Sequence, residues 1–217
     1  MPAAAGTPPE GVMMEASDVV AQEAPTARGR KRREQIIDAA EVLFHRQGFH
    51  ATSIDEIGAA AGITGPGLYR HFAGKDEILL GVFDRIWELL RSAIDRIEGL
   101  QPGAALDDLI STHTTLALDQ GAALMLLVRE LRYVPEYYQR AAERNDARYT
   151  DAWAEVIIKL HPELTLDEAR AAAHAVMGLI GSAARETADL RIEASRHRRI
   201  LHQMACASLA GFQNHLK

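Results

Sequence analysis

The spacing of apolar residues constrains the fold of this chain more than any other feature of its sequence. Apolar side chains recur every three or four residues in successive segments, and they almost nowhere alternate with polar β-branched residues. One such stripe, which begins near residue 75, carries Leu79, Val82, Ile86, Leu90 and Ile94. With 217 residues and 47% hydrophobic composition, the chain can bury a sizeable core. The pattern predicts an all-α protein of about nine helices.

Composition and helix breaks divide the chain into three parts. Residues 1–27 are rich in Ala, Pro and acidic side chains and carry no helical stripe, so we expect a disordered leader there. Residues 28–74 predict three short helices, the first running from Arg30 to a stop at Gly48. Residues 75–217 predict longer helices, from Lys75 to about Gly99 and near 104–118, 121–133, 136–160, 166–190 and 194–215. Met1, Met13 and Met14 stay open as starting residues.

Two short helices follow the first one, and each has a recognisable start. Ser53 with Glu56 three residues later forms a capping box, and Thr64 is the expected N-cap of the next helix. Pro66 falls in the first turn of that helix, where its missing N–H has no partner to lose. Two short helices joined by a glycine-containing turn indicate a helix-turn-helix, whose second helix enters the major groove of DNA.

The charge distribution agrees with a local DNA contact. The chain carries a net charge of −6, which argues against a protein that coats nucleic acid without specificity. Five basic residues nevertheless lie within 28–33, and Arg30, Lys31 and Arg32 are at their centre. They could act as an N-terminal arm on phosphates or in the minor groove. The alternative is a solvated charge cluster.

Residues 30–80 closely resemble the N-terminal domain of the TetR family of bacterial transcriptional repressors. The resemblance rests on Phe-x-x-x-Gly-Phe at the end of the first helix, a Thr-Ser capping position, Ala-Gly-Ile-Thr, Leu-Tyr-x-His-Phe and Gly-Lys-Asp. It implies DNA contacts from a set of residues in the second to fourth helices. These are Thr52, Ser53, Thr64, Gly65, Pro66, Gly67, Tyr69, Arg70, His71 and Lys75.

The leading edge of the third helix departs from many relatives, which carry polar side chains at the positions of Gly65 or Gly67. Because glycine has no side chain, fewer groups at this edge can read bases. Base recognition is therefore expected to depend more on Arg70, which could bind guanine, and on Thr64, which could reach a base or a phosphate. Tyr69 is expected to contact a phosphate, and the alternative is a tyrosine in the core of the small domain.

The C-terminal part is implied by the resemblance to bind a small effector and to form a homodimer. The expected dimer face consists mostly of small side chains: Ala171, Ala175, Gly178, Ser182, Leu201, Met204, Ser208 and Phe212. The expected effector residues are polar or polarisable: His113, Arg129, Tyr133, Tyr137, Trp153, His174 and Met177. An apolar wall of Leu116, Leu124, Leu127 and Met177 predicts a hydrophobic or amphipathic effector, with Arg129 or His113 facing an anionic head.

Other chemistries find little support in the sequence. Cys206 is the only cysteine and no His-x-x-x-His pair occurs, so neither a metal site nor a cofactor is expected. No secretion signal or membrane-spanning run is visible, which predicts a cytoplasmic protein. The sequence therefore predicts a ligand-responsive repressor on a near-palindromic operator. The alternatives are a helical binding protein or enzyme with a vestigial helix-turn-helix, or a DNA-binding protein without an effector.

Overall fold

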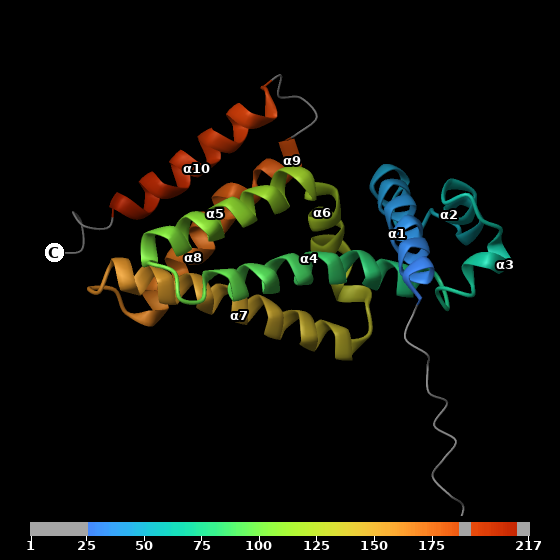
Figure 1. Ribbon diagram of the computed structural model, residues 1–217, viewed down its shortest axis with the longest axis horizontal. Coiled ribbons are helices and arrows are strands. Elements are labelled where there is room, and N and C mark those ends of the chain that lie inside the picture. The colour runs from blue at the N-terminus through green and yellow to red at the C-terminus, as the bar shows by residue number, and fades with distance from the viewer. Residues whose placement is uncertain (1–25, 187–191, 212–217) are drawn as a thin grey trace, which may run out of the picture.

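A computed structural model describes residues 26–186 and 192–211, and in these two stretches the chain forms helices joined by turns and short loops (Figure 1). The all-α prediction is confirmed. The elements are α1 (Ala27–Gln47), α2 (Ile54–Ala60), α3 (Gly65–Leu68), α4 (Lys75–Ile97), α5 (Pro102–Asp119), α6 (Gly121–Glu130), the 3-10 turn η1 (Leu131–Tyr133), α7 (Glu136–Leu160), α8 (Leu166–Gly181), α9 (Ala183–Glu186) and α10 (Ala194–Ala210).

The helix starts predicted from the sequence have the expected hydrogen bonds. The Ser53 hydroxyl accepts from the backbone N–H of Glu56 at 3.2 Å, and the Glu56 carboxylate accepts from the backbone N–H of Ser53 at 2.8 Å. Thr165 and Glu168 form the same capping box at the start of α8. Gly48 ends α1 with φ of +89°, a conformation that favours glycine. The local signals therefore fix these boundaries.

Two boundaries differ from the prediction. Thr26 caps α1 by accepting from the backbone N–H of Gly29 at 3.1 Å, so α1 begins at Ala27 rather than Arg30. The basic run therefore lies in the first two turns of a helix and not in an arm ahead of it. At the other end, α8 stops at Gly181 and the short α9 follows, because the chain turns at Ser182. The rest of the expected leader and residues 187–191 lie outside the described ranges.

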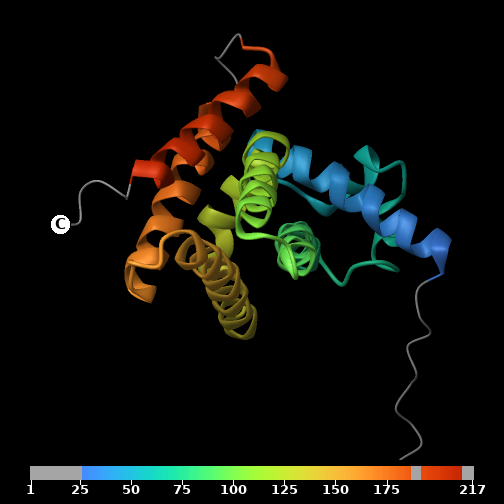
Figure 2. The same cartoon turned by 60° about the vertical axis from the view of Figure 1, so that its left-hand side comes forward.

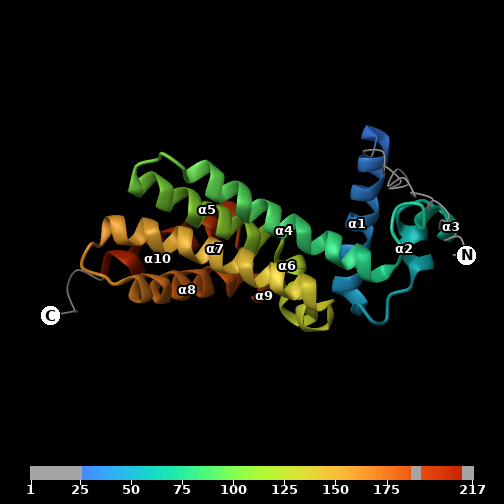
Figure 3. The ribbon, with the colours of Figure 1, turned by 90° about the horizontal axis from the view of Figure 1, so that it is seen from below.

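The N-terminal helices pack into a small unit at one end of the molecule. Figures 1 and 3 show α2 and α3 at this end, with α1 lying across the start of α4. Ile36, Phe44, Ile57, Leu68 and Phe72 are fully or almost fully buried at its centre. The spacing of these residues on α1, α2 and α3 is what brings the three short helices onto one core.

The remaining helices form a larger bundle, into which α4 runs directly. Helices α5 and α7 pack on α4, α8 packs on α5 and α7, and α10 lies on the outer side of α5 and α8 (Figures 1 and 2). Trp153 and Tyr149 of α7 are among the largest fully buried side chains. Because α4 belongs to both units, a movement of α4 within the bundle also moves the N-terminal helices.

Candidate DNA-binding surface and effector cavity

The third helix is short, and exposed side chains lie in it and on either side of it. The Thr64 hydroxyl accepts from the backbone N–H of Gly67 at 3.3 Å, as expected for an N-cap. Regular α-helix ends at Leu68, and turns carry the chain on to Phe72, whose N–H donates to Leu68 at 3.1 Å. Thr64, Pro66, Tyr69 and Arg70 are exposed, whereas Leu68 and Phe72 anchor the segment in the core.

The lack of side chains at Gly65 and Gly67 of α3 also relates to contacts within the protein. A Cβ atom at Gly65 would lie 2.6 Å from the Asp55 carboxylate of α2, and one at Gly67 would lie 3.2 Å from the Thr64 hydroxyl. The glycines thus leave room for the cap and for α2, in addition to any close approach of DNA. Both contacts are to the ends of side chains, so a larger residue at either position would require Asp55 or Thr64 to move.

The close contact between α2 and α3 depends on another glycine. Gly58 is buried, and a Cβ there would meet the carbonyl oxygen of Ile63 at 3.1 Å and the backbone nitrogen of Gly65 at 3.6 Å. Gly62 makes the turn between the helices with φ of +68°. The angle at which α3 leaves α2 is therefore set by backbone contact.

The position of Lys75 corrects one expectation. Its ammonium group donates to the carbonyl oxygens of Phe49 at 2.8 Å, His50 at 3.3 Å and Thr52 at 2.8 Å, and it lies 4.6 Å from the centre of the Phe49 ring. An ammonium group has three N–H donors, and all are used inside the protein. Lys75 therefore holds the loop between α1 and α2 in place, and we no longer count it among the phosphate contacts.

Thr52 is a second correction. Its side chain is buried, donates to the Gly48 carbonyl at 2.8 Å and accepts from the Gln47 amide at 3.3 Å. A hydroxyl committed in this way has no access to a DNA backbone. Ser53 is exposed but also engaged, because its hydroxyl donates to Glu56 at 2.8 Å. The Thr-Ser pair thus serves the loop and the cap of α2.

The basic run has an outer and an inner side. Arg30 and Lys31 are exposed, while Arg32 is half-buried and donates to the Ala61 carbonyl at 3.3 Å. Arg33 donates to the carbonyl of His71, and its guanidinium lies 4.0 Å from the centre of the Phe72 ring. The inner arginines join α1 to the turns around α3, whereas Lys31 is exposed on α1.

The bundle contains a cavity of about 290 Å³ between α4, α5, α6, α7 and α8. Its walls are mostly apolar, and they include Leu116, Leu124, Leu127 and Met177 of the expected apolar wall. The other apolar lining residues come from α4, α6, η1 and α7: Ile86, Trp87, Leu90, Val128, Leu131 and Ala142. Glu143, Asp146, Tyr149 and His113 add the polar groups. This composition suits a largely apolar small molecule.

His113 is the buried polar group of this cavity. Its Nε2 lies 3.2 Å from the carbonyl oxygen of Met177, so the neutral ring donates its proton there. Burial lowers the pKa of His113 to about 4. The other ring nitrogen, Nδ1, is buried without a hydrogen-bond partner among the described residues. It can accept a hydrogen bond from a donor on a bound ligand.

Comparison with known proteins identifies the family of the N-terminal unit. Residues 36–82 match the sequence profile described as bacterial regulatory proteins, tetR family, and these residues span the helix-turn-helix and the start of α4. Residues 36–82 therefore carry the DNA-binding unit of the TetR family.

Relatives agree with this assignment. The chain is 33% identical over 111 residues to the HTH-type transcriptional repressor KstR2 of Rhodococcus jostii (strain RHA1), a match that covers 46% of this chain and 53% of that protein. The chain thus spans about half the length of this relative.

Solved structures extend the similarity to the whole fold. A TetR-family regulator from Bordetella parapertussis 12822 gives a TM-score of 0.70 at 20% identity, covering 85% of this chain and 97% of that one. AibR in complex with isovaleryl coenzyme A and operator DNA gives 0.66 at 18% identity, covering 80% and 97%. At these identities the structures show that the TetR fold is shared.

Several of the expected effector residues lie outside the cavity. Arg129, Tyr133, Tyr137 and His174 are exposed and do not line it. Trp153 is fully buried and does not line the cavity either. Its ring stands edge-on to that of His113, with the ring centres 6.3 Å apart. Of the seven, only His113 and Met177 line the cavity, because helical spacing does not tell which face of α6 or α7 turns inward.

The sequence reading missed four polar or aromatic lining residues: Trp87, Glu143, Asp146 and Tyr149. Tyr149 was detectable in principle, since it precedes Trp153, an expected effector residue, by one helical turn. Burial raises the pKa of its hydroxyl, which therefore stays protonated. Glu143 and Asp146 place two carboxylates at the cavity, where Arg129 was expected to face the head group of a ligand. Arg129 is exposed and does not line the cavity.

The expected dimer face is largely exposed in the single chain. Ala171, Ala175, Gly178 and Ser182 lie uncovered along α8, and Met204 and Ser208 lie uncovered on α10. Leu201 is a correction, because it is 6% exposed and packs inside the chain with Ala205 and Leu209. Phe212 lies outside the described residues.

Among the helices of the described stretches, none combines the length and the apolar composition that a membrane span requires.

Proposed function

We propose that this chain is a ligand-responsive transcriptional repressor that binds a near-palindromic DNA operator as a homodimer in the cytoplasm. The observation that carries the proposal is the exposed face of Thr64, Pro66, Tyr69 and Arg70, in and around α3, on a helix-turn-helix anchored by the buried Ile57, Leu68 and Phe72. An exposed recognition helix on a well-packed support is what insertion into a major groove requires. An enzymatic role has no comparable support in the described residues.

Base reading would depend on few side chains. Arg70 is exposed in the turn that follows α3 and can form two parallel hydrogen bonds with guanine. Tyr69 is 58% exposed, so its hydroxyl can reach a phosphate while its ring packs along the backbone. Arg30 and Lys31 would add phosphate contacts from α1. Close approach of the bare α3 edge and DNA shape would supply the rest of the specificity.

Dimerisation would use the small side chains of α8 together with α10. Small residues let two helices approach closely, and the uncovered row on α8 has no other partner in the described chain. A two-fold axis there would place two α3 helices on half-sites about 34–36 Å apart.

The effector would occupy the cavity. The wall is apolar, His113 is neutral and the carboxylates of Glu143 and Asp146 stand at the lining, so a neutral or cationic amphipathic molecule fits better than an anionic one. This revises the anionic head expected from Arg129. AibR, which is bound to isovaleryl coenzyme A in its structure, shares the fold but carries no information on the ligand here.

Release from DNA would pass through α4 and α6. Helix α6 lines the cavity with Leu124, Leu127 and Val128 and also packs on α1. Its last residue, Glu130, is 3.5 Å from the His50 side chain in the loop after α1. A ligand that binds better when α6 is displaced would therefore favour a different spacing of the recognition helices.

The test is a selection of bound fragments from genomic DNA, followed by binding measurements on the enriched operator. Arg70→Ala should reduce the ratio of operator to random-DNA affinity, with a loss of about 1–3 kcal/mol on the operator alone. Arg46→Ala is the matched control, because Arg46 is exposed on α1 far from α3 in sequence. Failure to enrich any sequence, or equal losses on operator and random DNA, would contradict the proposal.

A further inference from the structure

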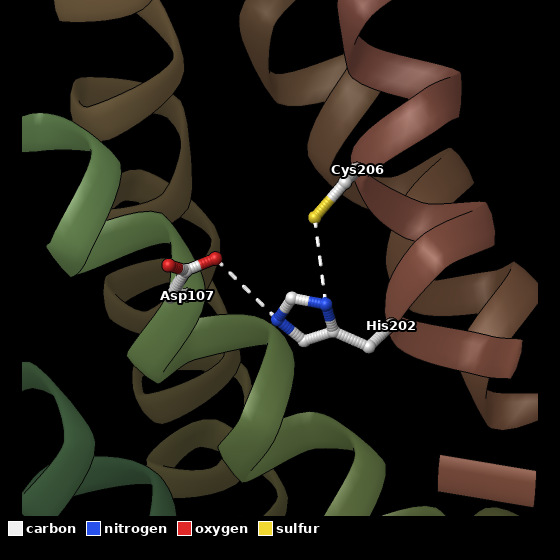
Figure 4. A group of neighbouring side chains, drawn as sticks. All are labelled: Asp107, His202 and Cys206. Atoms are coloured by element: carbon white, nitrogen blue, oxygen red, sulfur yellow. Dashed lines mark hydrogen bonds and ion pairs between the residues drawn. The ribbon is translucent and has the colours of Figure 1, made fainter. Parts of the chain in front are cut away.

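Three metal-ligating side chains meet where α10 lies on α5 (Figure 4). Cys206 Sγ is 3.7 Å from His202 Nδ1, and His202 Nε2 is 3.4 Å from Asp107 Oδ1. One ligand atom from each of the three residues lies within 4.8 Å of the others. We propose that Asp107, His202 and Cys206 form a binding site for a zinc-class divalent cation.

The separation of sulfur and nitrogen suits a single ion. Zinc–sulfur bonds of about 2.3 Å and zinc–nitrogen bonds of about 2.0 Å place two ligands of a tetrahedron roughly 3.6 Å apart. The observed 3.7 Å between Cys206 Sγ and His202 Nδ1 is close to this value. One helical turn separates the two residues on α10, so both side chains point the same way.

The third ligand comes from the neighbouring helix. Figure 4 shows the Asp107 carboxylate reaching from α5 toward the imidazole ring. Its side chain is 66% exposed and pairs with His202 across 3.4 Å, so it can turn toward an ion at Nδ1 at little cost. Two helices would then share one ion, and the fourth position would be open to water.

The donor set selects the cation. A thiolate and an imidazole favour borderline-soft ions such as Zn²⁺ over Mg²⁺ and Ca²⁺, which prefer oxygen ligands. The nearby Arg198 is paired with Asp119 at 2.5 Å, so its charge is largely compensated. A scan for His-x-x-x-His pairs overlooks this site because its second helical ligand is a cysteine.

The bound ion would hold α10 in place. Helix α10 contributes Leu201, Ala205 and Leu209 to the core, while its other side carries part of the proposed dimer face. An ion shared with α5 would stabilise the folded chain by mass action and fix the position of that face. The metal site itself does not depend on DNA binding.

The experiment titrates Co²⁺ into the full chain, without an affinity tag and with a non-thiol reductant, and then displaces it with Zn²⁺. Thiolate-bound Co²⁺ has a charge-transfer absorption, which we expect to saturate at one ion per chain and to vanish on Zn²⁺ addition. Cys206→Ser should abolish the absorption. His202→Ala and Asp107→Asn should each weaken Co²⁺ binding by about tenfold or more.

Two controls separate a site from chance binding. His197→Ala, a histidine on the same helix outside the cluster, should bind Co²⁺ like the wild type. Zn²⁺ should raise the thermal midpoint of the wild type and of His197→Ala but not that of Cys206→Ser. The proposal is overturned if no thiolate charge-transfer band forms. It is equally overturned if His202→Ala and Asp107→Asn both bind Co²⁺ with unchanged affinity.

Discussion

At the scale of single residues, the structure separates side chains that face outward from those that serve the fold. Lys75 and Thr52 resemble DNA-contacting positions, yet their polar groups bind the loop between α1 and α2. Loop carbonyls that have left water need such donors, because an unpaired buried carbonyl costs free energy. These residues support the DNA-binding surface from behind.

Replacing Lys75 by methionine tests this assignment. We expect the free energy of unfolding to fall by about 1.5–3 kcal/mol, because charge-assisted hydrogen bonds to three carbonyls are lost. The dependence of operator affinity on salt should keep its slope. Lys31→Met is the control, since this exposed side chain should leave stability unchanged and reduce the slope by about 1. A flatter slope for Lys75→Met would restore its phosphate role.

The pKa of His113 predicts a pH dependence of stability. Burial lowers it from 6.5 to about 4, so between these values the unfolded chain binds a proton that the folded chain does not. The contribution to stability is therefore full above pH 6.5 and is lost as pH falls toward 4, by about 3 kcal/mol. Chemical denaturation of wild type and His113→Gln across this range measures the difference. Parallel pH profiles for the two proteins would be inconsistent with a neutral buried ring.

At the scale of elements, backbone contact between α2 and the turn into α3 sets the presentation of the recognition helix. The buried Gly58 lets the two segments touch, and Gly62 allows the left-handed turn. Side chains elsewhere in the helix-turn-helix can adjust their rotamers, whereas two backbones cannot yield without moving a whole helix. The helix-turn-helix is therefore expected to be most sensitive to substitution at Gly58.

Gly58→Ala should displace α3. We expect a loss of stability of about 1–3 kcal/mol from overpacking, together with a larger loss of operator affinity than stability alone would cause. Gly103→Ala is the matched control, because a Cβ at that helical position has nothing within 4 Å and should leave stability equal or slightly higher. Thermal denaturation and operator titration measure both effects. Normal operator affinity in Gly58→Ala would refute the tight contact.

At the scale of the whole molecule, an uncovered row of small residues on α8 points to a second copy of the chain. Two identical helix-turn-helix units bind two half-sites at once only if a fixed interface holds them apart at the right distance. The face on α8 lies in the bundle far from α3 (Figure 1), so dimerisation and DNA contact use separate surfaces. A ligand between them can then alter one through the other.

Gly178→Arg tests the dimer. Gly178 is exposed and a Cβ there has nothing within 4 Å, so the single chain should fold normally while two copies clash. We expect a monomer in sedimentation velocity and a loss of operator affinity on the order of 10²-fold or more, since avidity disappears. Gly103→Arg, placed on α5, should remain dimeric. A dimer in both variants would move the interface elsewhere.

The sequence by itself determined the helical class, the positions of the helix starts and the DNA-binding unit. These depend on local physics: capping hydroxyls at Ser53, Thr64 and Thr165 and the spacing of apolar residues act within a few positions along the chain. These features can be predicted from the sequence because each capping residue or apolar stripe acts on the segment in which it lies.

Only the tertiary structure decided which polar side chains are free, which line the cavity and which meet across helices. Lys75 is committed to carbonyls more than twenty residues away in sequence, and Arg129 faces out while Glu143 lines the cavity. The cluster at His202 joins residues separated by about a hundred positions. Helical periodicity states which residues share a face, but the packing of α5, α7 and α10 decides what each face meets.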